Sequence, residues 1–242
     1  MKKKIIENIK TLFYALIIAL IIRSFLFQPF YIPSSSMEPN LLVGDRLFVS
    51  KYSYGYSQHS FPFSLKLFPG RILIKNPERG DIIVFKTPED NRTDFIKRLI
   101  GLPGDTIQFR DGIIYLNDKI IERNLIINDS QINCSNMNVE VNTYQETLPK
   151  GKNYQAVYNK IGSMKNTDKF IVPEKHFFFM GDNRDCSKDS RYLNSVGYVN
   201  FNNLVGKANL IFFSNDKNIG RWYEFWKWHK SIRFDRFFKK IS

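Results

Sequence analysis

The hydrophobic pattern changes character about thirty residues from the N-terminus. Residues 12–22 form an apolar run without a charged side chain, and the run continues past Arg23 and Ser24 to Phe27. As a helix, residues 11–27 would cover about 25 Å at 1.5 Å per residue, close to the roughly 30 Å hydrocarbon layer of a bilayer. The pattern therefore predicts a transmembrane helix over residues 11–27.

Three structures could explain this apolar run: a cleaved secretory signal, a buried core helix or a retained anchor. A cleaved signal needs small residues soon after its apolar stretch, whereas Arg23, Phe25 and Phe27 are bulky. Pro29 and Pro33 then stop a helix. We therefore expect a retained, single-pass anchor. Four lysines precede it and only Arg23 closely follows, so residues 1–10 are expected in the cytoplasm and the remaining chain outside the inner (plasma) membrane.

Beyond Phe30, short runs of β-branched and aromatic residues replace the helical pattern. They predict strands, together with a hairpin over 113–121 whose tip is Asn117 and Asp118; the strand ranges are 46–52, 81–86, 95–100, 106–109, 176–180 and 208–213. Composition shifts to Asn, Ser, Gln and Lys near residue 124, which indicates a β-rich insertion over 124–170. We expect a mainly β, antiparallel fold with core parts at 28–123 and 171–215.

Composition excludes several protein classes. The chain has 242 residues, 43% of them hydrophobic, so a buried core is expected rather than disorder. Ten Pro and 13 Gly show no short period, and two Cys are too few for a disulfide scaffold, so collagen-like and disulfide-rich folds are excluded.

The excess positive charge lies mainly at the two ends. The formal net charge is +13, and residues 221–242 combine seven Lys or Arg with all three Trp. A helix buried in the core and a surface that stacks on single-stranded nucleic acid are alternatives for this segment. Trp and basic residues together favour the membrane interface. We therefore predict that residues 216–242 contact membrane lipid, and expect no nucleic-acid partner.

Candidate chemistry lies in three polar segments, each of which has an ordinary structural explanation when taken alone. Residues 33–39 hold three serines between two prolines and resemble a linker; Lys97 interrupts an apolar strand; and residues 181–191 read as a polar turn. The three His and two Cys have no ligand spacing, and the acidic cluster around Asp182 lacks the pattern of a calcium loop. No metal or cofactor is expected, and a serine nucleophile here would need a base other than histidine.

The order of five blocks resembles that of the bacterial type I signal peptidases, the membrane-bound leader peptidases. Preceded by Arg23-Ser24-Phe25, the blocks are Pro33-Ser34-Ser35-Ser36-Met37-Glu38-Pro39, Gly44-Asp45, Arg79 to Phe85, Lys97 to Asp105 and Gly181-Asp182-Asn183-Arg184-Asp185. The resemblance covers the chain from the anchor to about Gly206 except the insertion. It implies that the chain cuts signal peptides from preproteins with small residues at positions −1 and −3, as a monomer near the secretion translocon.

The resemblance also implies roles for individual residues. Ser36 would be the nucleophile and Lys97 the general base, with Ser187 orienting the lysine amine and Ser34 contributing to the oxyanion hole. Structural support would come from Arg98, Asp182, Asp189 and Arg191. The substrate groove would be lined or bordered by Phe30, Ile32, Met37, Leu41, Leu47, Val84, Asp94, Phe95 and Ile96. Ser35 and Cys186 depart from residues common in the family, and pairing between Cys134 and Cys186 is left open.

The residues around Lys97 fit a basic role. With a reference pKa of about 10.4, roughly one lysine in 2,000 is neutral at pH 7, so burial must lower the pKa before the amine can accept a proton. Phe95, Ile96, Leu99 and Ile100 are apolar neighbours suited to that. A tethered β-domain that binds envelope proteins or lipid without catalysis is the alternative. A self-cleaving Ser-Lys repressor would need a DNA-binding helix-turn-helix, and none precedes Ser36.

Overall fold

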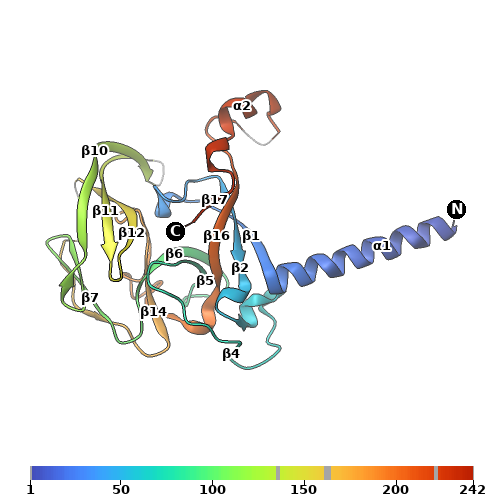
Figure 1. The fold of residues 1–242 in the computed structure, drawn as a ribbon, viewed down its shortest axis with the longest axis horizontal. Coiled ribbons are helices and arrows are strands. Elements are labelled where there is room, and N and C mark those ends of the chain that lie inside the picture. The colour runs from blue at the N-terminus through green and yellow to red at the C-terminus, as the bar shows by residue number, and fades with distance from the viewer. Residues whose placement is uncertain (1, 135–136, 161–164, 221–222, 242) are drawn as a thin grey trace.

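The N-terminal helix projects away from a β-rich body (Figure 1). The computed structural model describes residues 2–134, 137–160, 165–220 and 223–241. Helix α1 (Lys2–Ile21) continues as a π-helical turn (Ile22–Leu26) directly into strand β1 (Phe27–Tyr31). It begins before the predicted residue 11, and Phe27 already belongs to β1. Lys3–Leu26 is long and apolar enough to cross a membrane, about 36 Å for 24 residues.

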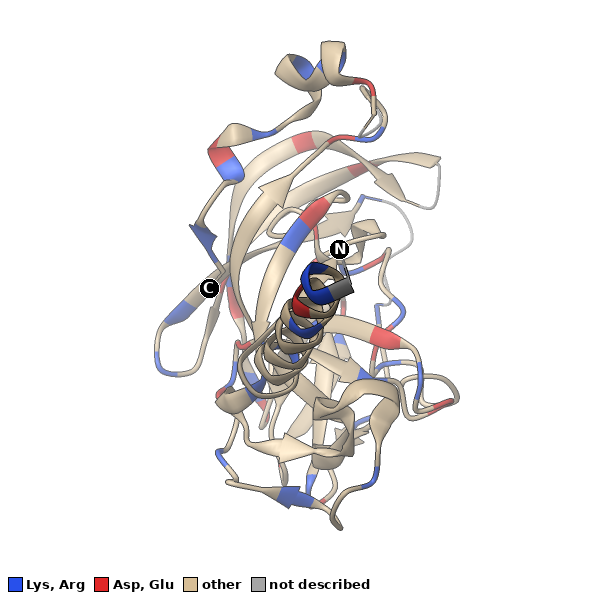
Figure 2. Cartoon of the chain, turned by 90° about the vertical axis from the view of Figure 1, so that its right-hand side faces the viewer, with Lys and Arg blue, Asp and Glu red and all other residues tan. Residues whose placement is uncertain are grey.

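Basic residues gather at the start of α1. Viewed along the helix, Lys and Arg lie near the N-terminus, and most of the length beyond them is free of charge (Figure 2). The lysines of residues 2–4 and 10 continue the helix because lysine is a good helix former. Hydropathy alone marks the apolar part of this helix and not its beginning.

A curled antiparallel sheet forms the centre of the body. Its order is β1-β2-β16-β5-β6-β14-β15. The short strand β17 pairs with Leu210 and Ile211 of β16, further along that strand than the residues that pair with β5. The bounds are β2 (Asp45–Ser50), β5 (Ile82–Lys86), β6 (Asp94–Gly101), β14 (His176–Met180), β15 (Val199–Asn200), β16 (Leu204–Ser214) and β17 (Lys239–Lys240).

Three smaller sheets surround the central one. A four-stranded sheet has the order β13-β7-β8-β9, and the insertion forms the sheet β10-β11-β12. A short pair, β3 and β4, lies between β2 and β5 in the chain. The bounds are β3 (Tyr56–Ser57), β4 (Arg71–Ile72), β7 (Thr106–Arg110), β8 (Ile113–Leu116), β9 (Lys119–Ile120), β10 (Glu122–Cys134), β11 (Met137–Leu148), β12 (Lys152–Asn159) and β13 (Phe170–Ile171).

The predicted mainly β class is confirmed. Each predicted run contains a strand, and the hairpin turns at Asn117 and Asp118, between β8 and β9. Alternation explains the register of β2, where Leu47 and Val49 face the core while Arg46 and Phe48 face outward. Strand β6 is buried continuously from Lys97 to Gly101; β5 pairs with its first part, up to Arg98, and β14 with its last part, from Arg98 to Gly101.

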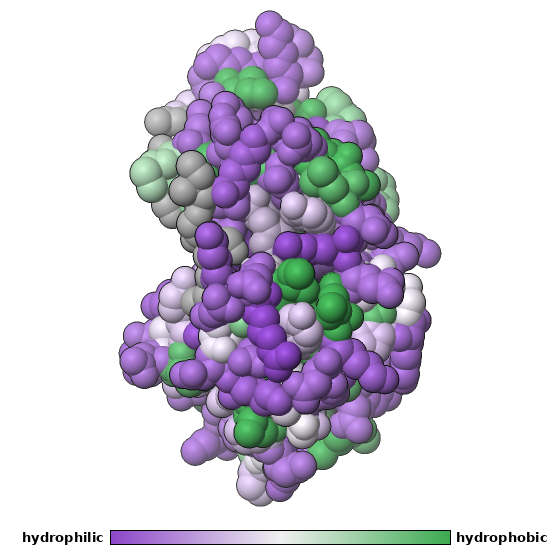
Figure 3. All heavy atoms as spheres, turned by 90° about the vertical axis from the view of Figure 1, so that its left-hand side faces the viewer, coloured by the Kyte–Doolittle hydropathy of each residue, from purple (hydrophilic) through white to green (hydrophobic). Residues whose placement is uncertain are grey.

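The apolar core consists of three clusters. One lies between the β7–β8 hairpin, β12 and β14; a second lies under β1, β2 and β16; and the third lies between β5, β6 and β14. The face opposite α1 is mostly hydrophilic, with smaller apolar patches (Figure 3). Exposed apolar side chains line α1, on the other side of the molecule.

The C-terminal segment is partly fastened to the body. It contains one helical turn, α2 (Trp228–Ser231), and ends in β17. Buried Arg236 forms a two-point ion pair with buried Asp45, at 2.9 and 2.6 Å. Trp226, Phe234 and other aromatics of the segment remain exposed. Arg221 and Trp222 lie outside the described residues, and contact of this segment with lipid stays a prediction.

Candidate active site

Ser36 lies in a short turn immediately after the first strand. The 3₁₀ turn Ser35–Met37 follows β1, and Met37 is fully buried, which anchors the turn in the core beneath the sheet. Ser36 itself is only 7% exposed. The Ser34 hydroxyl lies 3.3 Å from Ser36 Oγ. The stretch that resembles a linker is therefore a folded, packed turn.

Lys97 reaches Ser36 from the central sheet. Its Nζ donates a hydrogen bond of 2.5 Å to Ser36 Oγ, and the side chain is 4% exposed. The predicted strand alternation holds at this point, because Phe95 and Lys97 share a face and Lys97 Nζ lies 5.4 Å from the Phe95 ring centre. The structure thus brings together two residues that are 61 positions apart.

The electrostatics of the site increase the neutral fraction of Lys97 near physiological pH. Burial lowers the pKa of Lys97 from 10.5 to about 8, because desolvation disfavours the ammonium form. The carboxylates of Asp189 and Asp182 oppose this shift, and the Arg191 guanidinium adds to it. Each of these two carboxylates is itself paired with an arginine.

Two buried ion pairs form the walls around Lys97. Arg98 binds Asp182 through two hydrogen bonds of 2.7 and 2.9 Å, with both side chains fully buried. Arg191 binds Asp189 in the same way, at 2.8 Å for each bond. The guanidinium of Arg191 also keeps the pKa of the Asp189 carboxyl low, against the effect of burial. Removing one member of such a pair leaves an uncompensated buried charge, so all four residues shape the site.

Gly181 and Asn183 contact the turn that carries Ser36, and the sequence analysis assigned neither of them a role. A Cβ on Gly181 would lie 2.4 Å from the Ser36 carbonyl oxygen and 2.2 Å from Ser187 Oγ, so only glycine fits there. The Asn183 backbone N–H donates to the Ser36 carbonyl (3.2 Å), and its side-chain amide donates to the Ser35 carbonyl (3.1 Å). The position of these two residues in the polar block was the available signal.

Ser187 lies close to the site in a different arrangement from the one expected. It is buried, and no hydrogen bond joins its Oγ to Lys97 Nζ. The hydroxyl lies beside Asp189 instead and helps to lower the pKa of that carboxyl. An orienting role toward Lys97 stays a prediction.

The insertion sheet supports the loop that carries these residues. Arg184 is buried and donates to Glu146 at 2.7 Å and to the hydroxyls of Tyr154 and Tyr158 at 2.6 and 3.1 Å. Glu146 belongs to β11, and Tyr154 and Tyr158 belong to β12. The β10–β12 sheet is therefore fixed against the catalytic loop by a buried polar network, which the weak apolar pattern of residues 124–170 did not indicate.

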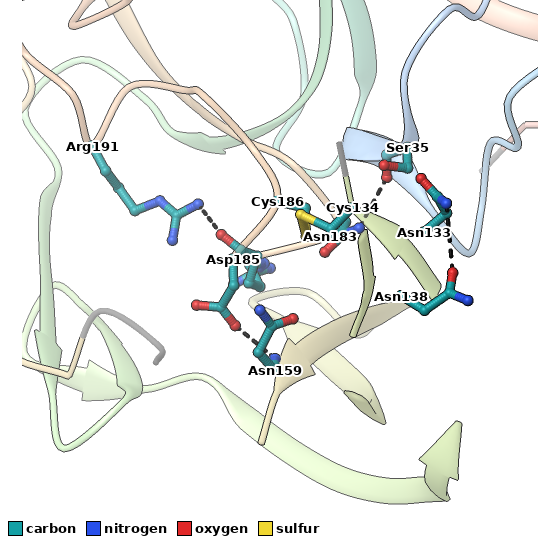
Figure 4. Close-up of a disulfide and its surroundings, with 10 residues drawn as sticks. Ser35, Asn133, Cys134, Asn138, Asn159, Asn183, Asp185, Cys186 and Arg191 are labelled. Carbon is teal, nitrogen blue, oxygen red and sulfur yellow. Dashed lines mark hydrogen bonds between the residues drawn. A yellow bond between two sulfur atoms is a disulfide. The ribbon is translucent and has the colours of Figure 1, made fainter. Parts of the chain in front are cut away.

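A disulfide joins the insertion to the same loop. Cys134, the last residue of β10, is bonded to Cys186, with a Cα–Cα distance of 5.7 Å, next to Ser187 (Figure 4). Around it, Asn183 contacts Ser35 and Asp185 accepts a hydrogen bond from the Asn159 backbone at 2.7 Å. The pairing left open by the sequence is thus present, and it ties the Ser187 loop to β10.

Removing this disulfide should destabilise the chain. Cross-linking residues 52 positions apart lowers the entropy of the unfolded chain by an amount worth about 4 kcal/mol. We expect the Cys134→Ser/Cys186→Ser double variant to lose up to that much free energy of unfolding in urea titrations followed by circular dichroism. Dithiothreitol should lower wild type to the same value and leave the double variant unchanged. Equal stability of oxidised and reduced wild type would contradict the cross-link.

The predicted groove residues divide into buried and accessible groups. Ile32, Met37, Leu41, Leu47 and Val84 are at most 2% exposed and belong to one core cluster under the Ser36 turn. Phe30, Phe95 and Ile96 are half-buried, and Asp94 is exposed and paired with Lys86. The half-buried and exposed residues are accessible to a peptide. The buried residues form the layer beneath them.

One edge of β6 is open beside Ser36. Residues 94–98 pair with β5 along one edge, whereas pairing with β14 begins only at Arg98. Within the described part of the chain, the second edge of residues 94–97 carries no strand. An extended peptide could add there, directly next to Lys97 and Ser36.

Histidine takes no part in this arrangement. His59 is buried, its ring bonds to Gln58 and Ser64, and burial lowers its pKa to about 4. His176 bonds to the Glu174 carbonyl and Asn200. Among the described residues no imidazole contacts Ser36 or Lys97, so the base available to Ser36 is the lysine.

Comparisons with known proteins agree with one another. The sequence profile described as signal peptidase, peptidase S26, matches residues 5–213. A protein named signal peptidase I from Rickettsia bellii (strain OSU 85-389) is 43% identical over 96% of this chain and 84% of its own length. One from Rickettsia prowazekii (strain Madrid E) is 42% identical over 94% of this chain and 90% of its own length.

A solved structure is also similar in sequence. The crystal structure of a signal peptidase I from Enterococcus faecalis V583 is 32% identical, covers 55% of this chain and 97% of its own, and has a TM-score of 0.33. With the profile match over most of the chain and relatives above 40% identity, the chain belongs to the signal peptidase family, peptidase S26, and is a membrane-associated serine peptidase.

Proposed function

We propose that this protein is a membrane-anchored endopeptidase that cleaves N-terminal signal peptides from preproteins, with Ser36 as nucleophile and neutral Lys97 as general base. The observation that carries this proposal is the 2.5 Å contact between Lys97 Nζ and Ser36 Oγ inside a buried site. A primary amine with a lowered pKa, in contact with a hydroxyl, is a suitable base for activating that hydroxyl.

Catalysis would proceed in two stages, acylation and deacylation, and in each stage Lys97 accepts one proton and then returns it. The neutral amine of Lys97 removes the Ser36 hydroxyl proton as Oγ attacks the carbonyl carbon of the scissile bond. The resulting ammonium then protonates the leaving amine, and an acyl-enzyme ester remains on Ser36. Water, deprotonated by Lys97, hydrolyses the ester and restores the serine. Each step uses a group already in place and needs no cofactor.

The negative charge that develops on the substrate oxygen needs hydrogen-bond donors. Ser34 Oγ lies 3.3 Å from Ser36 Oγ, and its side chain is exposed toward the site. Its hydroxyl and the Ser36 backbone N–H would form the oxyanion hole. Loss of one such donor typically costs about 10²- to 10³-fold in kcat.

The open edge of β6 suits substrate binding by strand addition. A signal peptide laid along residues 94–97 would gain main-chain hydrogen bonds while alternate side chains face the sheet. The floor beneath is filled by buried Ile32, Met37 and Leu47, which leaves little depth for large side chains. Small residues at positions −1 and −3 fit that floor, with Phe30 and Ile96 at its border.

The anchor would hold this site at the membrane surface. Lysines gather at the start of α1, so the positive-inside rule places the N-terminus in the cytoplasm and the β-body outside the inner membrane. Only β1 and three further residues separate the helical turn ending at Leu26 from the Ser35–Met37 turn. The site is thus near the place where a membrane-inserted signal peptide ends.

Activity should rise with pH as Lys97 loses its proton. The pKa of Lys97 is about 8, so about one site in ten holds the neutral amine at pH 7. We expect kcat/KM to increase up to tenfold per pH unit below about pH 8 and to level off above it, measured with a fluorogenic signal-peptide substrate.

Three variants test which titrating group causes this rise of kcat/KM with pH. His59→Gln and His176→Gln should keep it, since neither imidazole touches the site. Lys51 also has a pKa of about 8, but its Nζ bonds to the carbonyls of His59 and Ser60, so Lys51→Met should keep the rise as well. A rise near pH 6.5 that disappears with either histidine would contradict the Ser36–Lys97 assignment.

The decisive experiment is direct. The purified full-length chain is incubated with a preprotein, and the product is sequenced from its N-terminus. A single new N-terminus directly after a pair of small residues at −1 and −3 supports the proposal. Binding of the preprotein without cleavage, at pH 7 and pH 9, would favour the non-enzymatic β-domain instead.

A further inference from the structure

A large hollow of the described molecule lies away from the catalytic site. It is a groove of about 1060 Å³ between the end of α1 and the outer face of the central sheet. Core residues Leu47 and Val49 lie on the Ser36 side of the sheet, whereas Phe48, between them on β2, faces the groove. The groove therefore lies across the sheet from the catalytic turn, and the proposed mechanism does not use it.

Strand register builds the groove floor. Pro29 of β1 pairs with Phe48 of β2, Phe48 with Leu210 of β16, and Leu210 with Lys240 of β17. These four neighbours form a row across four strands, and all of them line the groove. At about 4.8 Å between strands, the row is roughly 14 Å long, apolar over three positions and cationic at the fourth.

The wall of the groove is the last part of the membrane helix. Ala19 and Arg23, four residues apart, lie on one face of the helix and line the groove together. The small Ala19 side chain takes up little of the groove, and Arg23 adds a second cation to its lining. The helix therefore contributes both apolar residues and one cation, Arg23, to the groove.

The charges at the groove are unbalanced. Of the described residues, no Asp or Glu lines it, and neither Arg23 nor Lys240 forms an ion pair with a described residue. Gln28, Asn209 and Tyr52 add further polar groups to the lining. An apolar floor with two cations that form no ion pair among the described residues suits an occupant that is long, apolar and negatively charged at one end.

We propose that this groove binds one anionic phospholipid, whose acyl chain covers the Pro29–Phe48–Leu210 row and whose phosphate pairs with Arg23 and Lys240. The inference rests on the proposed anchoring by α1, which places the groove at the level of the outer headgroups. The apolar segment of a signal peptide would fill the floor as well, but it is uncharged and would leave both cations without partners. The lipid would also wedge α1 against the sheet and so fix the body relative to the membrane.

Native mass spectrometry of the full-length chain in detergent tests this proposal. The probes are palmitoyl-oleoyl phosphatidylglycerol and the zwitterionic palmitoyl-oleoyl phosphatidylcholine, each titrated separately. We expect one retained phosphatidylglycerol per chain and weaker phosphatidylcholine binding. With two phosphate-facing cations removed, Arg23→Gln/Lys240→Gln should bind phosphatidylglycerol about thirtyfold more weakly, with little change for phosphatidylcholine.

Matched controls separate a site from general attraction. Lys10→Gln/Lys239→Gln removes the same charge away from the groove and should change phosphatidylglycerol binding less than threefold. Ala19→Phe fills the groove without changing charge and should weaken both lipids about tenfold. Equal losses in the two double variants, or no effect of Ala19→Phe, would overturn the proposal in favour of unspecific adsorption.

A photocrosslinker identifies the occupant. With p-benzoylphenylalanine at position 210 and both lipid vesicles and a synthetic signal peptide present, we expect crosslinks to lipid. Crosslinks to the peptide would overturn the lipid assignment. Preprotein cleavage is measured in parallel: a chain that cleaves but retains no lipid refutes only the groove, and one that retains lipid without cleaving refutes only the proposed activity.

Discussion

Replacing Ser36 by alanine should reduce preprotein cleavage by at least about 10⁴-fold, the largest single effect we expect. The substitution removes the atom that attacks the scissile carbonyl. It also removes the acceptor of the Lys97 hydrogen bond and leaves the 3₁₀ turn in place. The measurement is the rate of product formation by gel densitometry under single-turnover conditions.

Ser35→Ala is the matched control for this variant. Ser35 lies in the same turn, and its carbonyl oxygen accepts hydrogen bonds from the Asn183 amide and the Glu38 backbone N–H, whereas its hydroxyl forms no hydrogen bond with a described residue. We expect Ser35→Ala to cleave within a few-fold of wild type, and both variants to show the wild-type circular dichroism spectrum. Near wild-type cleavage by a folded Ser36→Ala chain would refute the nucleophile assignment.

Lys97→Met and Lys97→Arg should each be as inactive as Ser36→Ala. Methionine has no base, and arginine keeps its proton at every accessible pH, so neither can accept the Ser36 proton. A lysine with a pKa lowered by burial is a cost to folding at pH 7, because the unfolded chain binds the proton more readily than the folded chain. Lys97→Met should therefore be no less stable than wild type, which separates loss of chemistry from loss of fold.

Lys51→Met provides the comparison for Lys97. Both lysines are buried and have a lowered pKa, but the hydrogen bonds of Lys51 Nζ within the described part of the chain go to the backbone carbonyls of His59 and Ser60. A folded Lys51→Met chain should keep cleavage and its pH profile. Activity of Lys97→Arg above a few percent of wild type, at any pH between 7 and 10, would rule out Lys97 as the general base.

The pattern of hydrophobic and polar residues predicted those features of the fold that depend on residues close together in the sequence. The alternation in β2, the hairpin at Asn117 and Asp118 and the apolar run of α1 depend on neighbours within a few residues, and the structure contains all three. The start of α1 at Lys2 was missed because hydropathy follows the apolar part of a helix, whereas lysine extends a helix without adding hydropathy.

The candidate site was predicted by residue type and by resemblance, and its contacts were not. The ordered blocks pointed to Ser36 and Lys97, but the two side chains meet only because β6 and the turn after β1 pack over one core cluster. The depth of burial that lowers the pKa of Lys97 is likewise a property of the packed sheet.

The sequence by itself determined the apolar N-terminal helix, the strands, the charge at the two ends and the residues proposed as the reactive pair, because each depends on short-range periodicity or on ordered motifs. The tertiary structure decided what depends on distant partners. It brought Cys134 and Cys186 together as a disulfide and paired Glu146 with Arg184. It also requires glycine at position 181, because a Cβ there would clash with the Ser36 carbonyl oxygen. It also opened the groove between α1 and the sheet, since no local pattern records how a helix and four strands leave space between them.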